Sequence, residues 1–186
     1  MIKKESLAAG KILIAEPFLK DEYFIRSVIV LADYNNDGAY GFIFNRTLDL
    51  DVNEALENFP ELNSSVFLGG PVARDNVFYI HTYGDIIEGS QKIMEGLYWG
   101  GDFYQLKQKI EEGIIKEENI RFLAGYAGWD HGQLEKEIKE KSWIITQVSA
   151  QILLNTNPEN LWKRLLNDMG DEYAQMANYP IDPNLN

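Results

Sequence analysis

The side chains best suited to chemistry lie near the ends of predicted strands, and the first pair is Asn45 and Arg46. An arginine beside an amide, at the end of the strand predicted over residues 40–45, can bind a carboxylate or a phosphate through two parallel hydrogen bonds. The alternative is that Arg46 pairs with an internal acidic residue and anchors the loop after the strand. The sequence therefore predicts either a small anionic ligand or a structural ion pair here.

The chain has two histidines, His81 and His131, which could transfer protons near neutral pH. His81 ends an apolar strand, where a hydrogen-bonded, half-buried histidine is the alternative. His131 follows Asp130, but neighbouring side chains in a loop diverge, so we interpret Asp130 as the N-cap of the next helix. With no cysteine, a zinc site would need both histidines to converge with a carboxylate. We therefore predict no catalytic set, no metal and no cofactor.

A glycine-rich segment over residues 125–135, GYAGWDHGQLE, connects a predicted strand to a predicted helix. Loops rich in glycine and aromatic residues hold backbone shapes that other residues could not take, and they often carry binding residues. Trp129 could line an apolar pocket or a partner surface, although such residues also belong to cores. We therefore include Gly125, Gly128, Trp129 and Asp130 among the candidate binding residues.

Gly69 and Gly70 follow another predicted strand. Two glycines at a strand end could allow a ligand to reach backbone N–H groups. The segment lacks the Lys-Ser/Thr of a phosphate-binding loop and the glycine spacing of a dinucleotide fold. A tight turn with close backbone packing is therefore the alternative to a ligand site.

The composition is that of a globular protein with an acidic surface. Of 186 residues, 45% are hydrophobic and 12% aromatic, and the net charge is −12. Such a field repels a nucleic-acid backbone, and the lysines of the predicted helices alternate with glutamates, so direct nucleic-acid binding is disfavoured. No apolar run approaches the ~20 residues of a membrane-spanning helix, and no signal-peptide core follows the N-terminus, so we expect a cytoplasmic protein.

Apolar runs and helix caps predict a mixed α/β (α+β) fold. Residues 27–32 and 40–45, joined by the turn-forming segment DYNNDG, are typical of an antiparallel hairpin. Strands that occur both in hairpins and between helices favour a largely antiparallel sheet or a partial barrel, flanked by helices. Further strands are predicted over residues 11–15, 66–68, 77–82, 120–126 and 143–147, and helices with their caps over residues 51–59, 102–113, 132–141 and 157–170.

The length fits a single domain over residues 1–186. We place its core at about residues 10–170. The end of the chain carries two prolines after Tyr179, and we expect a C-terminal strap over residues 171–186.

Several motifs together resemble one bacterial family. They are DEYFIRSVIVL over residues 21–31, GAYGFIFNRT over 38–47, FLGGPV over 67–72, and GYAGWDHGQLE over 125–135. In this order they are similar to the YqgE/AlgH family, whose biochemistry is not established and whose members are often labelled transcriptional regulators. The resemblance implies a single α/β domain in a cytosolic bacterial protein, and it carries over no catalytic residues.

The leading hypothesis is a non-enzymatic cytoplasmic protein that acts through binding and regulates indirectly. Its expected surface consists of Asn45 and Arg46, Gly69 and Gly70, and the segment over residues 125–132. The partner is either another protein or a small anionic ligand.

Two alternatives stay open. The first is a hydrolase or transferase for a small anionic substrate, with Arg46 holding the anion and His81 or the pair Asp130 and His131 moving protons. The second is an oligomeric scaffold built on exposed aromatic residues. The sequence does not favour one oligomeric state.

Overall fold

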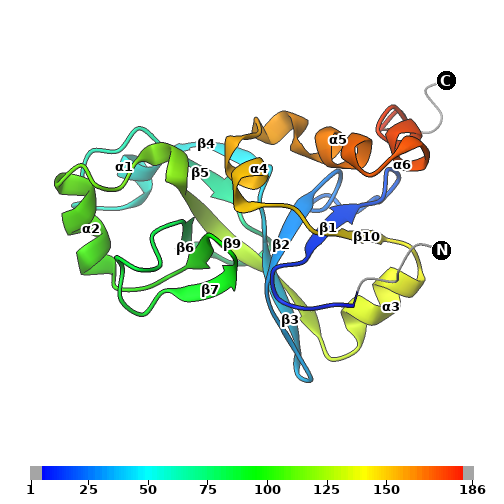
Figure 1. Ribbon diagram of the computed structural model, residues 1–186, viewed down its shortest axis with the longest axis horizontal. Helices are drawn as coiled ribbons and strands as arrows, with labels where there is room; N and C mark the ends of the chain where they lie inside the picture. Colours follow the sequence, from blue (N-terminus) through cyan, green and yellow to red (C-terminus); the bar gives the residue numbers. More distant parts are fainter. Residues whose placement is uncertain (1–5, 182–186) are drawn as a thin grey trace.

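The computed structural model describes residues 6–181, in which ten strands form one open, largely antiparallel sheet flanked by six α-helices (Figure 1). The strand order is β10-β1-β2-β3-β9-β6-β8-β7, and β5 joins from outside this path by pairing with β9 and β4. The expected mixed α/β, single-domain fold is therefore confirmed. The strands are β1 (Ile12–Ala15), β2 (Val28–Asn35), β3 (Gly38–Ile43), β4 (Thr47–Asp51), β5 (Ser65–Leu68), β6 (Val72–His81), β7 (Gln91–Met94), β8 (Leu97–Trp99), β9 (Ile120–Asp130) and β10 (Trp143–Thr146).

Strand β9 joins the two halves of the sheet. Its first half lies between β6, which is antiparallel to it, and β5, which is parallel, so that Phe122 faces both Tyr79 and Val66. Its last residues, up to Asp130, pair with the first residues of β3. In Figure 1, β9 runs from the half that contains α1 and α2 toward the half that contains α3. β9 therefore sets the position of the β2–β3 hairpin relative to β5 and β6.

The predicted β2–β3 hairpin is present, and its strands extend further into the turn than expected. Asp33 pairs with Tyr40 and Asn35 with Gly38, which leaves only two residues at the tip. The N–H of Asp37 donates to the side-chain oxygen of Asn35 at 2.8 Å, and Gly38 takes a φ of +144°. Turn-forming residues thus close the hairpin at its tip while their neighbours join the ladder.

Capping side chains in the sequence set where two of the helices begin. The carboxylate of Asp102 accepts the N–H of Gln105 at 2.8 Å before α2 (Phe103–Glu111). The side chain of Asn157 accepts the N–H of Glu159 at 3.0 Å before α5 (Pro158–Asp168). Both helices were predicted from these caps. The other helices are α1 (Val52–Ala55), α3 (Gln133–Lys139), α4 (Ala150–Asn155) and α6 (Asp171–Met176), with a 3-10 helix at Glu117–Asn119.

Three predicted boundaries are wrong. The helix predicted over residues 51–59 ends at Ala55, since Leu56 is extended and Asn58 takes a φ of +53°. The glycine-rich segment is not a loop, because β9 continues to Asp130 by pairing with β3. Asp130 is therefore not an N-cap, and Gly132, with a φ of +75°, precedes α3 instead.

The sequence also did not predict β4, β7, β8, α4 and α6. Helix α6 lies within the range 171–186 that we expected to form a strap. Residues 1–5 and 182–186, at the two ends of the predicted domain, lie outside the described residues.

Helices cover both faces of the sheet, and alternation along β1 shows why. Ile12 and Ile14 pack with Leu153 of α4 on one face, whereas Leu13 packs with Leu134 of α3 on the other. A third cluster joins β5, β6 and β9 to the helices α1 and α2. Its buried members are Val52, Val66, Tyr79, Ile87, Leu106, Ile110, Ile115, Ile120, Phe122 and Ala124.

Glycine backbones meet where β9 passes the connection between β5 and β6. The N–H of Gly69 donates to the carbonyl of Ala124 at 2.8 Å, and the carbonyl of Gly69 accepts the N–H of Ile43 at 2.7 Å. A methyl group on Gly69 would lie 2.2 Å from the oxygen of Gly125. Gly125 takes a φ of +72°, and a methyl group there would lie 2.6 Å from the oxygen of Gly70. This contact admits no side chain, so the three glycines are required for packing.

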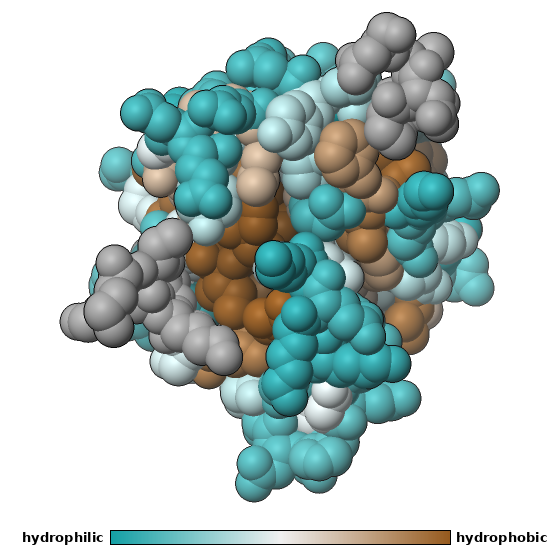
Figure 2. Space-filling model, turned by 90° about the vertical axis from the view of Figure 1, so that its right-hand side faces the viewer, coloured by the Kyte–Doolittle hydropathy of each residue, from teal (hydrophilic) through white to brown (hydrophobic). Residues whose placement is uncertain are grey.

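Figure 2 shows the end of the molecule that lies on the right in Figure 1, where apolar atoms are visible in a hollow between polar surfaces. Strand β10 forms that edge of the sheet and, within residues 6–181, pairs only with β1. In the same part of the chain, no helix is long and apolar enough to cross a membrane.

We expect Gly69→Ala to lower the free energy of unfolding by about 3 kcal/mol, because its new methyl group meets backbone atoms that cannot rotate away. Gly128→Ala is the matched control, since its nearest neighbour would be a Tyr126 ring atom at 3.4 Å. The control should change stability by no more than about 0.5 kcal/mol. Urea unfolding of both variants measures the difference, and equal effects would contradict the packing role of Gly69.

Candidate functional site

Two cavities lie at opposite ends of the β2–β3 hairpin. The hairpin cavity, near the tip, has a volume of about 440 Å³, and its walls include Gly128 and Val72. The α5 cavity, near the other end, has a volume of about 240 Å³. The acidic and aromatic side chains that line the hairpin cavity are Asp33, Asp37, Tyr40, Tyr126, Trp129 and Asp130. The lining of the α5 cavity includes Arg26, Ser27, Asn45, Arg46, Glu159 and Lys163.

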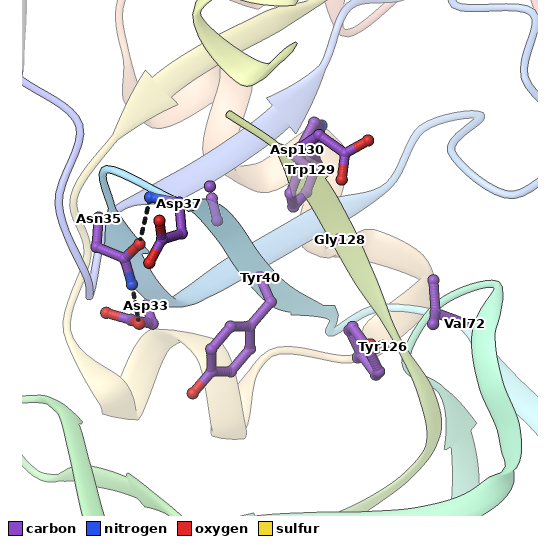
Figure 3. A pocket seen from close by; sticks show the side chains of 11 residues that line it. Asp33, Asn35, Asp37, Tyr40, Val72, Tyr126, Gly128, Trp129 and Asp130 are labelled. Atoms are coloured by element: carbon purple, nitrogen blue, oxygen red, sulfur yellow. Dashed lines mark hydrogen bonds between the residues drawn. The ribbon is translucent and has the colours of Figure 1, made fainter. Parts of the chain in front are cut away.

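Asp33 and Asp37 lie together on one side of the hairpin cavity, whereas Asp130 lies apart from them on β9 (Figure 3). Asn35 organises the first two, because its amide nitrogen donates to the carboxylate of Asp33 at 2.9 Å while its oxygen accepts the N–H of Asp37 at 2.8 Å. Asp130 is exposed at the end of β9 and adds a third carboxylate to the lining. Burial, and then the charge of Asp33, raise the pKa of Tyr40. The cavity lining therefore combines acidic side chains with a phenol that is neutral at neutral pH.

Aromatic rings form the other wall of the hairpin cavity. The rings of Tyr40 and Tyr126 meet edge to face with centroids 6.3 Å apart, and Tyr40 also meets Trp99 at 5.9 Å. Trp129 lines the cavity but is only 6% exposed, and its indole N–H donates to the carboxylate of Glu137 at 2.8 Å. Trp129 thus belongs mainly to the core, and the two tyrosines supply the accessible ring surface.

Asn45 and Arg46 line the α5 cavity at the end of β3. The Asn45 side chain accepts the N–H of Val28 at 2.8 Å and donates to the carbonyl of Arg26 at 3.0 Å. Nη1 of Arg46 donates to the carbonyls of Glu22 and Tyr23 at 2.9 and 3.2 Å. The structural partner of Arg46 is therefore main chain, and not the acidic side chain considered from the sequence.

His81 is fully buried at the end of β6, in the other half of the molecule. Its Nδ1 accepts the N–H of Tyr83 at 3.1 Å, so Nε2 carries the proton and donates to the carbonyl of Gly100 at 2.9 Å. Burial lowers the pKa of His81, although the bond to Gly100 opposes this. Both nitrogens are thus satisfied in the neutral form, as in a structural histidine.

Asp130 and His131 do not act on each other. The N–H of Asp130 donates to the side chain of Gln133 at 3.0 Å. His131 is exposed, and its Nδ1 lies 2.5 Å from the carbonyl of Asn36 at the hairpin tip. The backbone of Asp130 therefore contacts the first turn of α3, and the side chain of His131 contacts the hairpin tip.

The ten candidate residues thus fall into separate surroundings. Gly128, Trp129 and Asp130 line the hairpin cavity, and Asn45 and Arg46 line the α5 cavity. The glycines at positions 69, 70 and 125 meet one another, and His81 lines neither cavity. Among residues 6–181, no three His, Cys, Asp or Glu side chains form a group that could hold a metal ion.

Sequence reasoning missed several residues of both cavities. In the hairpin cavity these are Asp33, Asp37 and Tyr40, for which the dense turn segment was the only signal. In the α5 cavity they are Arg26 and Lys163, which lie far apart in the chain and had no common pattern.

His81 should make stability depend on pH. Because burial holds its pKa below the ordinary 6.5, the unfolded chain takes up a proton first as the pH falls. The stability contributed by neutral His81 is present above pH 6.5 and is lost as the pH falls through the folded pKa, with a slope of at most about 1.4 kcal/mol per pH unit.

We therefore expect the stability difference between wild type and His81→Gln to shrink from pH 7.5 to pH 5. Urea unfolding at each pH measures it, and His131→Gln, at the exposed histidine, is the control. A difference that stays constant over this range would argue against a buried, neutral His81.

Comparison with known proteins identifies the family of this chain. The family DUF179, described as AlgH-like, matches residues 12–174. A UPF0301 protein of Cytophaga hutchinsonii is 44% identical over 181 residues, which cover 97% of this chain and 100% of that protein. A UPF0301 protein of Chlorobium luteolum is 41% identical over 180 residues, which cover 97% and 95%.

Two solved structures have the same fold. The solution structure of the AlgH protein from Pseudomonas aeruginosa has a TM-score of 0.72 and 25% identity, and the match covers 97% of this chain and 98% of that one. A crystal structure of a Corynebacterium diphtheriae protein has a TM-score of 0.79 over 96% and 95% of the two chains, at 18% identity. The motifs, the family match and the relatives agree, and the chain belongs to the AlgH-like family.

Proposed function

We propose that this protein is a non-enzymatic binding protein whose hairpin cavity receives a basic side chain from a partner protein. One observation carries the proposal: the larger of the two cavities combines three carboxylates with two accessible tyrosine rings. Carboxylates and aromatic faces both attract a lysine ammonium or an arginine guanidinium.

The charge of the site supports a cationic ligand. The chain has a net charge of −12, and Asp33, Asp37 and Asp130 line the cavity. Long-range attraction of a basic partner follows from the same field.

The surroundings of the cavity favour a protein segment over a free amine. Val72 is 39% exposed beside the cavity, and the backbone of Gly128 is exposed at its other wall. An extended segment could contact these groups while its basic side chain enters between Asp33 and Tyr40. An apolar contact next to a charged one is typical of protein recognition.

The proposal includes an indirect role in regulation, in the cytoplasm. The label of transcriptional regulator that related proteins carry would then describe an effect exerted through a protein partner. The acidic charge opposes direct contact with nucleic acid.

The enzyme alternative has less support. It needs either His81 or the pair Asp130 and His131 beside Arg46, but Arg46 lines one cavity, Asp130 lines the other, and His81 is buried and lines neither. A scaffold of several copies built on exposed aromatic residues also stays a prediction, and size-exclusion with light scattering would test it.

Short capped peptides with a central lysine or arginine and no acidic residue are suitable probes. We expect them to shift the NMR amide signals of Gly38 and Gly128, and norleucine in place of lysine should abolish the shifts. The double variant Asp33→Asn, Asp130→Asn should bind about tenfold more weakly, which corresponds to ~1.4 kcal/mol for two partly exposed charge contacts.

The control removes two exposed carboxylates from other loops and strands, in the double variant Asp49→Asn, Asp85→Asn. It changes the net charge equally and should leave the affinity unchanged. Equal weakening by both double variants, or equal binding of the norleucine peptide, would refute the proposed site.

A further inference from the structure

The α5 cavity concentrates positive charge on a strongly acidic protein. Its lining includes Arg26, Arg46 and Lys163, and one acidic side chain, Glu159. The whole chain has 29 acidic and 17 basic residues, so a surface region chosen at random is expected to have a net negative charge. In Figure 1, α5 lies close to β2, and the cavity lies between the start of this helix and the ends of β2 and β3.

The buried hydroxyl of Ser27 indicates that the α5 cavity binds a ligand. It lines the α5 cavity and is only 3% exposed, and its hydroxyl oxygen is buried without a hydrogen-bond partner among the described residues. Buried hydroxyls nearly always have a partner, because leaving one unpaired lowers stability. A ligand oxygen inside the cavity would accept the proton of this hydroxyl.

Arg26 is fixed in an uncommon conformation beside Ser27. Its backbone φ is +50°, a value that residues with side chains rarely take, and its carbonyl accepts the Asn45 side chain at 3.0 Å. Its guanidinium lies 4.7 Å above the ring of Trp162 and donates through Nη2 to the carbonyl of Tyr179. Nε of Arg26 is buried and has no partner in residues 6–181. Strained residues that are held this firmly often belong to ligand sites.

Arg46 is held in a similar way. Its two hydrogen bonds to main-chain carbonyls are both made through Nη1. Within the described part of the chain, its Nε and Nη2 are therefore available to a ligand. A guanidinium that is positioned in advance loses little entropy when it binds an anion.

The first turn of α5 also faces the cavity. The N–H groups of Glu159 and Asn160 are already bonded to Asn157, at 3.0 Å each, so the helix contributes through its dipole and not through free donors. Lys163, one turn later, is exposed and can move toward a ligand.

We infer that the α5 cavity binds the oxyanion group of a small molecule, a phosphate or a carboxylate. Ser27, Arg26 and Arg46 supply donors from its walls, and Lys163 closes over it from α5. A volume of about 240 Å³ suits such a group with a short carbon chain. The site is independent of the proposed function, because the hairpin cavity has the opposite charge and a different lining.

Isothermal titration with inorganic phosphate and with succinate, at equal ionic strength in a buffer without either anion, tests the inference. We expect saturable binding of one of them, and the preferred one identifies the chemistry of the natural group. Lys163→Gln should weaken binding about threefold to tenfold, as loss of one partly exposed cation does. Lys136→Gln is the matched control on α3 and should bind like wild type.

Two further variants separate a ligand site from a structural one. Ser27→Ala should weaken binding about tenfold without lowering the melting temperature of the free protein, since its hydroxyl has no partner to lose. Glu159→Gln should tighten binding a few-fold, because it removes the one charge of the same sign as the ligand.

The inference is overturned if neither anion binds in a saturable way, or if Lys136→Gln weakens binding as much as Lys163→Gln, which would indicate nonspecific screening. It is also overturned if Ser27→Ala binds like wild type and loses stability, which would make the hydroxyl structural. None of these results depends on whether basic peptides bind the hairpin cavity.

Discussion

The contact between the backbones of β9 and of the β5–β6 connection determines how the rest of the molecule is arranged. Gly69 is hydrogen-bonded on both sides, to Ala124 and to Ile43, and leaves 2.2 Å between a hypothetical methyl group and Gly125. With a φ of +72° at Gly125, β9 turns from its partners β5 and β6 toward β3 without leaving the sheet. Two half-sheets can therefore share one strand, and the β2–β3 hairpin extends past them with a cavity at each end.

The two ends of the β2–β3 hairpin line cavities of opposite charge. Near its tip, Asp33 and Asp37 line a negative cavity with tyrosine walls, and at its other end Arg26 and Arg46 line a positive one. The polar groups of the first cavity are partly exposed, whereas Ser27 in the second is buried. An open acidic site suits a flexible partner chain, and a smaller basic site with buried donors suits a compact anion, since buried donors act in a lower dielectric.

Among residues 6–181, Arg121 connects the shared strand to its surroundings without a carboxylate partner. It is 6% exposed, donates to the carbonyls of Phe44 and Leu154 at 2.6 and 3.2 Å, and lies 4.2 and 4.6 Å above the rings of Phe44 and Phe67. Burial lowers its pKa to about 10, so it stays charged at neutral pH. This buried cation connects β9, β5, the end of β3 and α4, and it shows that a basic residue in this fold is not by itself a sign of function.

Local chemistry was enough to predict the β2–β3 hairpin, the capped helices α2 and α5 and the α/β class, and the order of the motifs was enough to predict the family. Such features depend on neighbours in the chain, as Asp102 and Asn157 show. Two features became visible in the fold alone. The segment after Gly125 is a strand because its partners lie in β3, and Arg26 and Lys163 line the same cavity. Pairing across the sheet and burial bring together residues far apart in sequence, and no local pattern records them.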